Sequence, residues 1–92
     1  MYRIKFTNTF KKSYKRAVKR GLDISLLDKV IEKLSKGHTL EAKYKNHELK
    51  GKYQWFNECH IKPDRLLIYL IEDDILTLTL VDTGSHSDLF DL

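Results

Sequence analysis

The chain has 92 residues, of which 41% are hydrophobic and one is a cysteine. This length predicts a single domain over residues 1–92 with one modest core. No apolar run approaches the roughly 20 residues that a membrane span needs, and the N-terminal MYRIKF has no signal-peptide segment, so we expect a cytoplasmic protein without a membrane partner. The lone Cys59 excludes an internal disulfide and a zinc site built from cysteine pairs.

Charge is divided unevenly along the chain, although the net formal charge is only +4. Residues 1–52 hold 15 Lys and Arg against 5 Asp and Glu, whereas residues 53–92 hold 2 against 8. A basic half favours a polyanionic partner such as RNA, because lysines near phosphates release condensed counterions. Lysines that only solvate helix surfaces explain the same charge equally well.

The first half of the chain predicts one strand and two helices. Residues 2–6 alternate between apolar and polar side chains, which indicates a strand. Asn8 or Thr9 can cap a helix whose apolar residues recur every three or four positions until Gly21 ends it. Residues 24–36 repeat this period and predict a second helix, antiparallel to the first.

The second half predicts three strands. We expect strands over residues 54–61 and 66–71, joined by a type I turn at KPDR, with the second strand buried in the centre of the sheet. After a tight turn at EDD, residues 75–81 alternate and should direct Leu76, Leu78 and Leu80 to the core. A strand, two helices and an antiparallel meander make a small α+β sandwich.

Two adjacent aromatic residues, Trp55 and Phe56, fall in the first of these strands. Neighbouring side chains of a strand point to opposite faces of the sheet. We therefore expect at least one of the two in the core, while the other could stack on a base of bound RNA.

Three histidines and one carboxylate fall at strand ends or in loops: His47, His60, His86 and Asp64. Metal-free cleavage of RNA needs a base for the ribose 2′-OH, a cation near the phosphate, and an acid for the leaving 5′-oxygen. Imidazole can serve as base or acid near neutral pH, since its unperturbed pKa is about 6.5. Each residue alone has an ordinary explanation; for example, Asp64 is a common residue type in a β-turn. The set as a whole, however, suits this chemistry.

Three motifs, YKNHELKGKY, ECHIKPDRLLIY and TGSHSDLF, together resemble the YafQ branch of the RelE-type bacterial toxins. The likeness runs over nearly the whole chain and implies a RelE-like fold with a short C-terminal tail. It further implies the toxin of a type II toxin–antitoxin pair. Such a toxin is a ribosome-dependent endonuclease that cleaves messenger RNA codons in the A site through the 2′-OH, without a metal or other cofactor. The implied partners are a cognate antitoxin, the ribosome and messenger RNA.

The same resemblance implies roles for particular residues. We predict that Asp64 and His86 form the main proton-transfer pair, and that His47 and His60 position or stabilise the phosphate. Phe90, which follows His86 in the tail motif, is expected beside the substrate base.

One position departs from the family pattern. Asp82 stands before the TG of the tail motif, where the family often has an arginine that would stabilise charge on the phosphate. Losing an electrostatic stabiliser of this kind can cost about 10²–10³ in rate. Arg65 is the first candidate to replace it because it borders Asp64, and Lys50 and Lys52 are the other candidates. Without such a replacement, either the enzyme is weak or contacts with the ribosome dominate.

Two other functions stay open. Asp82 is compatible with a catalytically degenerate toxin that only binds an antitoxin or RNA. A ParE-like poison of DNA gyrase is the second alternative, but such a protein would not need histidines for proton transfer.

Overall fold

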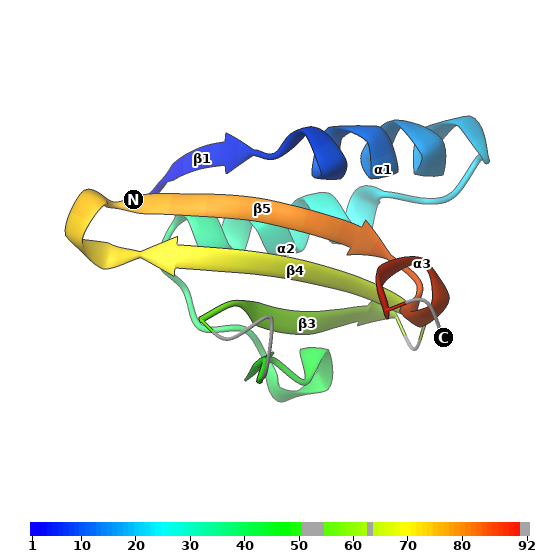
Figure 1. Ribbon diagram of the computed structural model, residues 1–92. Helices are drawn as coiled ribbons and strands as arrows, with labels where there is room; N and C mark the ends of the chain where they lie inside the picture. The colour runs from blue at the N-terminus through cyan, green and yellow to red at the C-terminus, as the bar shows by residue number, and fades with distance from the viewer. Residues whose placement is uncertain (51–54, 63, 91–92) are drawn as a thin grey trace.

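Five strands form one mixed sheet in the part of the chain that the structure describes, in the order β1-β5-β4-β3-β2 (Figure 1). The structure is a computed structural model and describes residues 1–50, 55–62 and 64–90, with the backbone alone at residues 86 and 90. The strands are β1 (Arg3–Phe6), β2 (His47–Glu48), β3 (Asn57–Lys62), β4 (Arg65–Glu72) and β5 (Thr77–Gly84), and the helices are α1 (Asn8–Lys19), α2 (Ser25–Ser35) and α3 (His86–Phe90).

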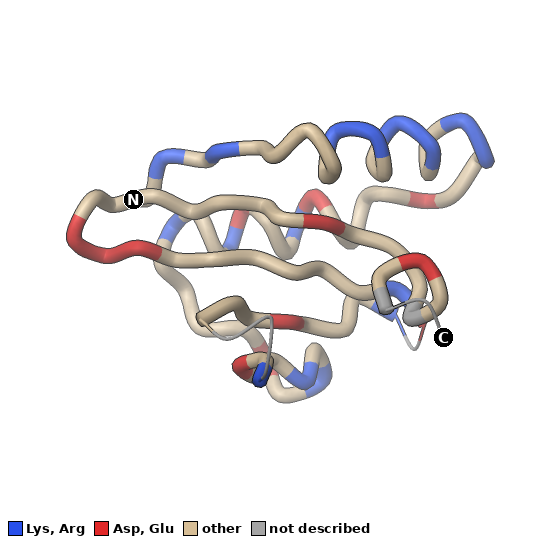
Figure 2. Tube along the Cα trace, in the orientation of Figure 1, with Lys and Arg blue, Asp and Glu red and all other residues tan. Residues whose placement is uncertain are grey.

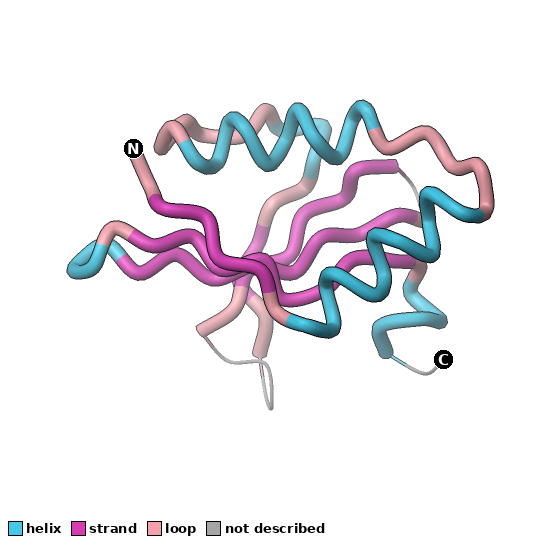
Figure 3. The backbone as a smooth tube through the Cα atoms, turned by 90° about the horizontal axis from the view of Figure 1, so that it is seen from above, coloured by secondary structure: helices cyan, strands magenta, loops and turns pink. Residues whose placement is uncertain are grey.

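The helices occupy different sides of the sheet. α2 covers one face, α1 runs beside β5, and α3 lies on the other side of the sheet at the end of β5 (Figures 1 and 3). β3, β4 and β5 form the predicted antiparallel meander, with β4 in the centre, and β1 pairs with β5 in parallel. The predicted α+β fold is confirmed. None of the described helices is long and apolar enough to cross a membrane.

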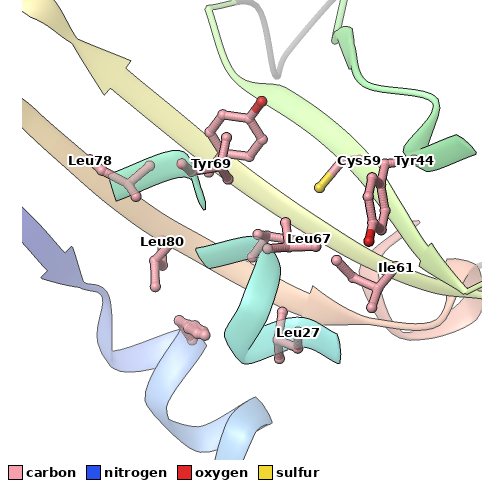
Figure 4. Close-up of a cluster of buried hydrophobic side chains, with 11 residues drawn as sticks. Leu27, Tyr44, Cys59, Ile61, Leu67, Tyr69, Leu78 and Leu80 are labelled. Atoms are coloured by element: carbon pink, nitrogen blue, oxygen red, sulfur yellow. The ribbon is translucent and has the colours of Figure 1, made fainter. Parts of the chain in front are cut away.

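The core lies between the sheet and the two long helices (Figure 4). Its largest fully buried side chains include Phe10 of α1, Val30 of α2 and Leu80 of β5. Fully burying a side chain of this size contributes about 1.5–3 kcal/mol. Cys59 of β3 is also fully buried, and its burial raises the pKa of the thiol to about 12, so the sulfur is a packing atom rather than a nucleophile.

The N-terminal cap of α1 is Thr7, and the predicted caps Asn8 and Thr9 are wrong. Thr7 Oγ1 accepts a hydrogen bond of 3.0 Å from the backbone N–H of Phe10 and donates one of 2.7 Å to the carbonyl of Val81. The cap residue must be extended, and Thr7 satisfies this while it also joins α1 to β5. That second bond depends on tertiary structure.

Replacing Thr7 with Ala should therefore lower the free energy of unfolding by about 1–2 kcal/mol, because the helix loses its cap and β5 loses a partner. Thr9→Ala is the matched control, at an exposed position inside the helix, and should change the stability by less than about 0.5 kcal/mol. Urea denaturation of the two variants measures the difference. Equal effects at both positions would contradict the assignment of the cap.

The expectation that Trp55 or Phe56 enters the core is wrong. β3 begins at Asn57 rather than at residue 54, so both aromatic residues precede the strand. Trp55 has a φ of 82° in a turn and is 76% exposed, and Phe56 is half-buried. A left-handed backbone is unusual for so large a side chain and breaks the alternation on which the prediction relied.

The start of β5 also differs from the prediction. Residues Asp73–Ile75 form a 3₁₀ turn, and Leu76 follows it with a φ of 47°. Leu76 is 56% exposed rather than buried, whereas Leu78 and Leu80 are fully buried as predicted. Ile75 and Leu76, which were predicted in the strand, therefore lie in and directly after the turn. The type I turn predicted at KPDR includes Pro63, which lies outside the described residues.

Candidate active site

Two of the predicted histidines lie together around a carboxylate that the sequence did not single out. β2 pairs His47 with Glu58, and His60 follows Glu58 by two residues on the same face of β3. Nε2 of His47 and Nε2 of His60 each lie 3.4 Å from Oε1 of Glu58. The two rings are 6.2 Å apart between centroids. The fold thus brings residues from two strands into one histidine–carboxylate cluster.

Glu58 is only 4% exposed, although it is an acidic residue. A buried carboxylate is costly unless charged or polar groups compensate it, and here the two imidazoles do so. Glu58 was not predicted as a site residue, because the alternation of polar and apolar residues along β3 already explains a polar residue at this position. The signal that could have found it is the pairing of an acidic residue with a histidine two positions on, both on the face of β3 opposite to the core residues Cys59 and Ile61.

His47 is oriented by its own backbone neighbourhood. Its Nδ1 lies 2.9 Å from the carbonyl oxygen of Lys45, which can only accept a hydrogen bond. Nδ1 therefore carries a proton, and Nε2 is directed at Glu58. His47 itself was predicted in a connecting loop, but it begins β2, a strand of two residues.

A basic pocket adjoins the histidine cluster. It has a volume of about 350 Å³ and is lined by His60, Lys43, Lys45 and Lys62, with Tyr44 among the apolar residues of its wall. These lysines differ from the predicted substrate-binding pair. Lys50 is exposed after β2, and Lys52 lies outside the described residues. The pocket offers positive charge next to an imidazole, an arrangement that suits an RNA phosphate.

The C-terminal motif lies at the end of the sheet where β3 ends and β4 begins, near His60. His60 lies opposite Leu66, and Leu66 lies opposite Gly84, so the backbones of His60 and Gly84 are two strand spacings apart, roughly 10 Å. α3 begins two residues later, at His86. The predicted tail is therefore a short helix. The side chains of His86 and Phe90 lie outside the described part of the chain, and their roles stay predictions.

A reciprocal pair of hydrogen bonds fixes the start of α3. Ser85 Oγ accepts from the N–H of Asp88, and Asp88 Oδ2 accepts from the N–H of Ser85, each at 3.1 Å. Gly84 makes room for this arrangement, since a Cβ there would lie 3.0 Å from Cβ of Asp88. The hydrogen bonds from Ser85 hold the pKa of Asp88 below its usual range, and Arg65 and Arg20 lower it further.

The stabilising effect of Asp88 should depend on pH. A carboxyl whose pKa is lowered by folding stabilises the protein above its unfolded pKa, and this contribution is lost as the pH falls through the folded pKa. Wild type should therefore be more stable than Asp88→Asn at pH 7, and the difference should shrink at pH 3. Urea denaturation at both pH values measures it. A difference that stays constant would show that the ionised form is not responsible.

Asp64 is the last residue of the turn between β3 and β4, and Arg65 is the first residue of β4. Asp64 is exposed in the turn, and Arg65 is half-buried at the start of the strand. Arg65 lowers the pKa of Asp88 and lines a small pocket with Arg16 and Arg20, beside the start of α3. The predicted replacement for the missing arginine is thus near α3 and not within the pocket that adjoins His60.

Asp82, the departure from the family pattern, has a structural partner. Its Oδ1 accepts a hydrogen bond of 2.6 Å from the hydroxyl of Ser13 in α1 and one of 2.8 Å from the N–H of Thr83. The carboxylate therefore joins β5 to α1.

The histidine–carboxylate cluster could also hold a metal ion. One ligand atom each from His47, Glu58 and His60 lie within 4.8 Å of one another. Imidazole nitrogens and carboxylate oxygens are common ligands of zinc and of other transition metals. The same atoms can therefore serve either proton transfer or metal binding.

The fold is similar to the solved structures of small bacterial toxins. The crystal structure of a metal-bound toxin from Helicobacter pylori is 48% identical to this chain, with a TM-score of 0.91, over 98% of this chain and 100% of that one. YafQ in the Escherichia coli DinJ–YafQ complex is 32% identical, with a TM-score of 0.88, over 98% of this chain and 99% of that one.

Sequence comparison identifies the family within this class. The model of a family described as the bacterial toxin YafQ of type II toxin–antitoxin systems matches residues 2–91. The mRNA interferase toxin YafQ of Escherichia coli strain K12 is 35% identical over 89 residues, which are 95% of this chain and 94% of that protein. This chain therefore belongs to the YafQ family of type II toxins, which confirms the resemblance of its three motifs.

Proposed function

We propose that this chain is a messenger RNA endonuclease that cleaves codons in the ribosomal A site and is held inactive by an antitoxin. The observation that carries the proposal is the cluster in which Glu58 lies 3.4 Å from both His47 and His60, beside a pocket lined by lysines. The relative from Escherichia coli named mRNA interferase toxin supports the reaction, and its complex with DinJ supports the antitoxin partner.

The reaction is a transesterification within the RNA. The 2′-oxygen attacks the adjacent phosphorus, the bond from phosphorus to the 5′-oxygen breaks, and a cyclic phosphate and a free 5′-hydroxyl result. Asp64 and His86 exchange the two protons, one from the 2′-OH and one to the leaving 5′-oxygen. The imidazoles of His47 and His60 stabilise the charge that develops on the phosphate.

Glu58 acts through the histidines rather than on the RNA. Its carboxylate is buried between the two rings and pairs with whichever of them is protonated. It is therefore a positioning residue, which presents charged or hydrogen-bonding imidazole edges to the phosphate in a fixed geometry. Lys43, Lys45 and Lys62 would hold the neighbouring phosphates of the RNA strand, beside His60.

Expression of the chain in bacteria, followed by mapping of new 5′ ends in messenger RNA, tests the proposed function against its alternatives. The proposal predicts new ends inside codons of translated frames, with no increase in DNA breaks. Breaks that depend on gyrase would indicate a ParE-like poison. Binding to ribosomes or antitoxin without any new RNA ends would indicate a degenerate toxin.

A further inference from the structure

Trp55 carries an exposed indole ring close to the histidine–carboxylate cluster. It lies two residues before β3, the strand that holds Glu58 and His60, and it is 76% exposed. Among the described residues between positions 23 and 74, no other large apolar side chain is exposed. The ring takes no part in the hydrophobic core and is available to another molecule.

The backbone of Trp55 lies in the left-handed region, with a φ of 82°. Bulky side chains rarely adopt this conformation, and the positions that keep it cluster at ligand-binding sites. The β2–β3 hairpin is still ordered at the next residue, because the N–H of Leu49 donates a hydrogen bond of 2.9 Å to the carbonyl of Phe56. The strained residue is therefore attached directly to the end of the hairpin that holds the cluster.

Trp55 lies within the length of a few nucleotides from the cluster. Three residues separate it from Glu58, and β2 places His47 opposite Glu58. Three residues of chain span at most about 10 Å. The bases of a stacked strand lie about 3.4 Å apart, so this span corresponds to about three nucleotides. An RNA strand whose phosphate contacts His47 and His60 therefore brings a neighbouring base within reach of the indole.

The charge around this hairpin favours a nucleic acid over an apolar protein surface. Figure 2 shows basic residues on the segment that runs past β3 into β2, to which Lys43, Lys45 and Lys50 belong. A protein partner usually buries several apolar side chains that lie together, whereas this indole stands alone. A single flat ring among lysines is typical of a site where a base stacks and phosphates are held nearby.

We propose that Trp55 stacks on a base of the messenger RNA next to the cut and so helps to hold the strand on the cluster. The inference rests on the proposed function and adds a substrate-binding residue to it. The ring contacts a base and not the reacting atoms. It should therefore strengthen binding of the RNA more than it raises the rate of the bound complex.

Removing the ring without disturbing the backbone tests this role. Glycine favours a φ of 82°, so Trp55→Gly should fold, which circular dichroism verifies. Cleavage of ribosome-bound messenger RNA is measured under single-turnover conditions over a range of toxin concentrations. Trp55→Gly should raise the concentration that gives half the maximal rate about tenfold or more, with the maximal rate within a few-fold of wild type. Trp55→Phe keeps an aromatic face and should stay within about threefold.

Leu76→Gly is the matched control for this change. Leu76 is also exposed and also has a left-handed φ, of 47°, but it lies between β4 and β5, outside the β2–β3 hairpin. This variant should show the concentration dependence of wild type. An unchanged concentration dependence in Trp55→Gly, or an equal change in Leu76→Gly, would overturn the role of the indole.

Messenger RNAs that lack a single base identify the stacking partner. One base is removed at each position of the A-site codon, or at the position that follows it, and wild type is compared with Trp55→Gly. At one position the missing base should weaken wild type about tenfold and leave Trp55→Gly unchanged, because that variant has already lost the contact. Equal effects on both proteins at every position would show that Trp55 does not stack on these bases, and would refute the proposal. No cleavage of any messenger RNA by the wild type would overturn the proposed function itself.

Discussion

Glu58→Gln is expected to lower the rate of messenger RNA cleavage by about 10²–10³ while the protein stays folded. Glutamine keeps the shape of the side chain but removes the negative charge that lies 3.4 Å from both imidazoles. The two histidines then lose the group that orients them toward the phosphate. Cleavage of ribosome-bound messenger RNA under single-turnover conditions measures the loss.

Glu48→Gln is the matched control for this change. Glu48 lies beside His47 in β2, but it is exposed, and its side chain points to the opposite face of the sheet. We expect a change of no more than a few-fold there. A positioning role also predicts that the pH–rate profile changes in Glu58→Gln and not in Glu48→Gln. A cleavage rate within a few-fold of wild type in Glu58→Gln would overturn the role of this carboxylate.

His86→Ala is expected to lower the cleavage rate by about 10²–10⁴, the typical contribution of a general acid or base. The backbone of α3 begins at His86, close to the end of the sheet where β3 enters the turn with Asp64. Asp64→Ala should cause a loss of similar size, and the double variant should lose little more, since the two residues act in one reaction.

His38→Ala serves as the control for a lost imidazole, because His38 is an exposed histidine that follows α2 and lies outside the cluster. It should cleave at the wild-type rate. If His86→Ala and Asp64→Ala each cleaved within a few-fold of wild type, the proposed proton-transfer pair would be wrong, and the histidine–carboxylate cluster alone would have to accept the proton of the 2′-OH and donate one to the 5′-oxygen.

Local signals in the sequence predicted the elements of this fold well. Gly21 and Gly37 end the two long helices, with φ values of 73° and 77°. The apolar run at residues 66–71 is the buried strand β4. The parallel pairing of β1 with β5 and the cap at Thr7 were missed, because both depend on contacts between residues far apart in the chain.

In the candidate site too, local features could be predicted from the sequence, whereas contacts between distant residues could not. His47 and His60 were selected by residue type and lie together, but the carboxylate between them, Glu58, becomes recognisable only through the short strand β2. A strand of two residues leaves no periodic pattern to read. Asp82 was noted only as a departure from the family pattern, and its hydrogen bond from the hydroxyl of Ser13, 69 positions away in the chain, could not be predicted from the sequence.

The most direct test of the proposed reaction uses ribosomes paused on a defined messenger RNA, once all-ribose and once with a single 2′-deoxynucleotide at the cut position. Transesterification through the 2′-OH predicts a cut in the A-site codon of the first RNA, only when ribosomes are present, and no cut at that position in the second. Persistent cleavage at the 2′-deoxynucleotide would contradict the proposed chemistry, and equal cleavage of naked RNA would contradict the dependence on the ribosome.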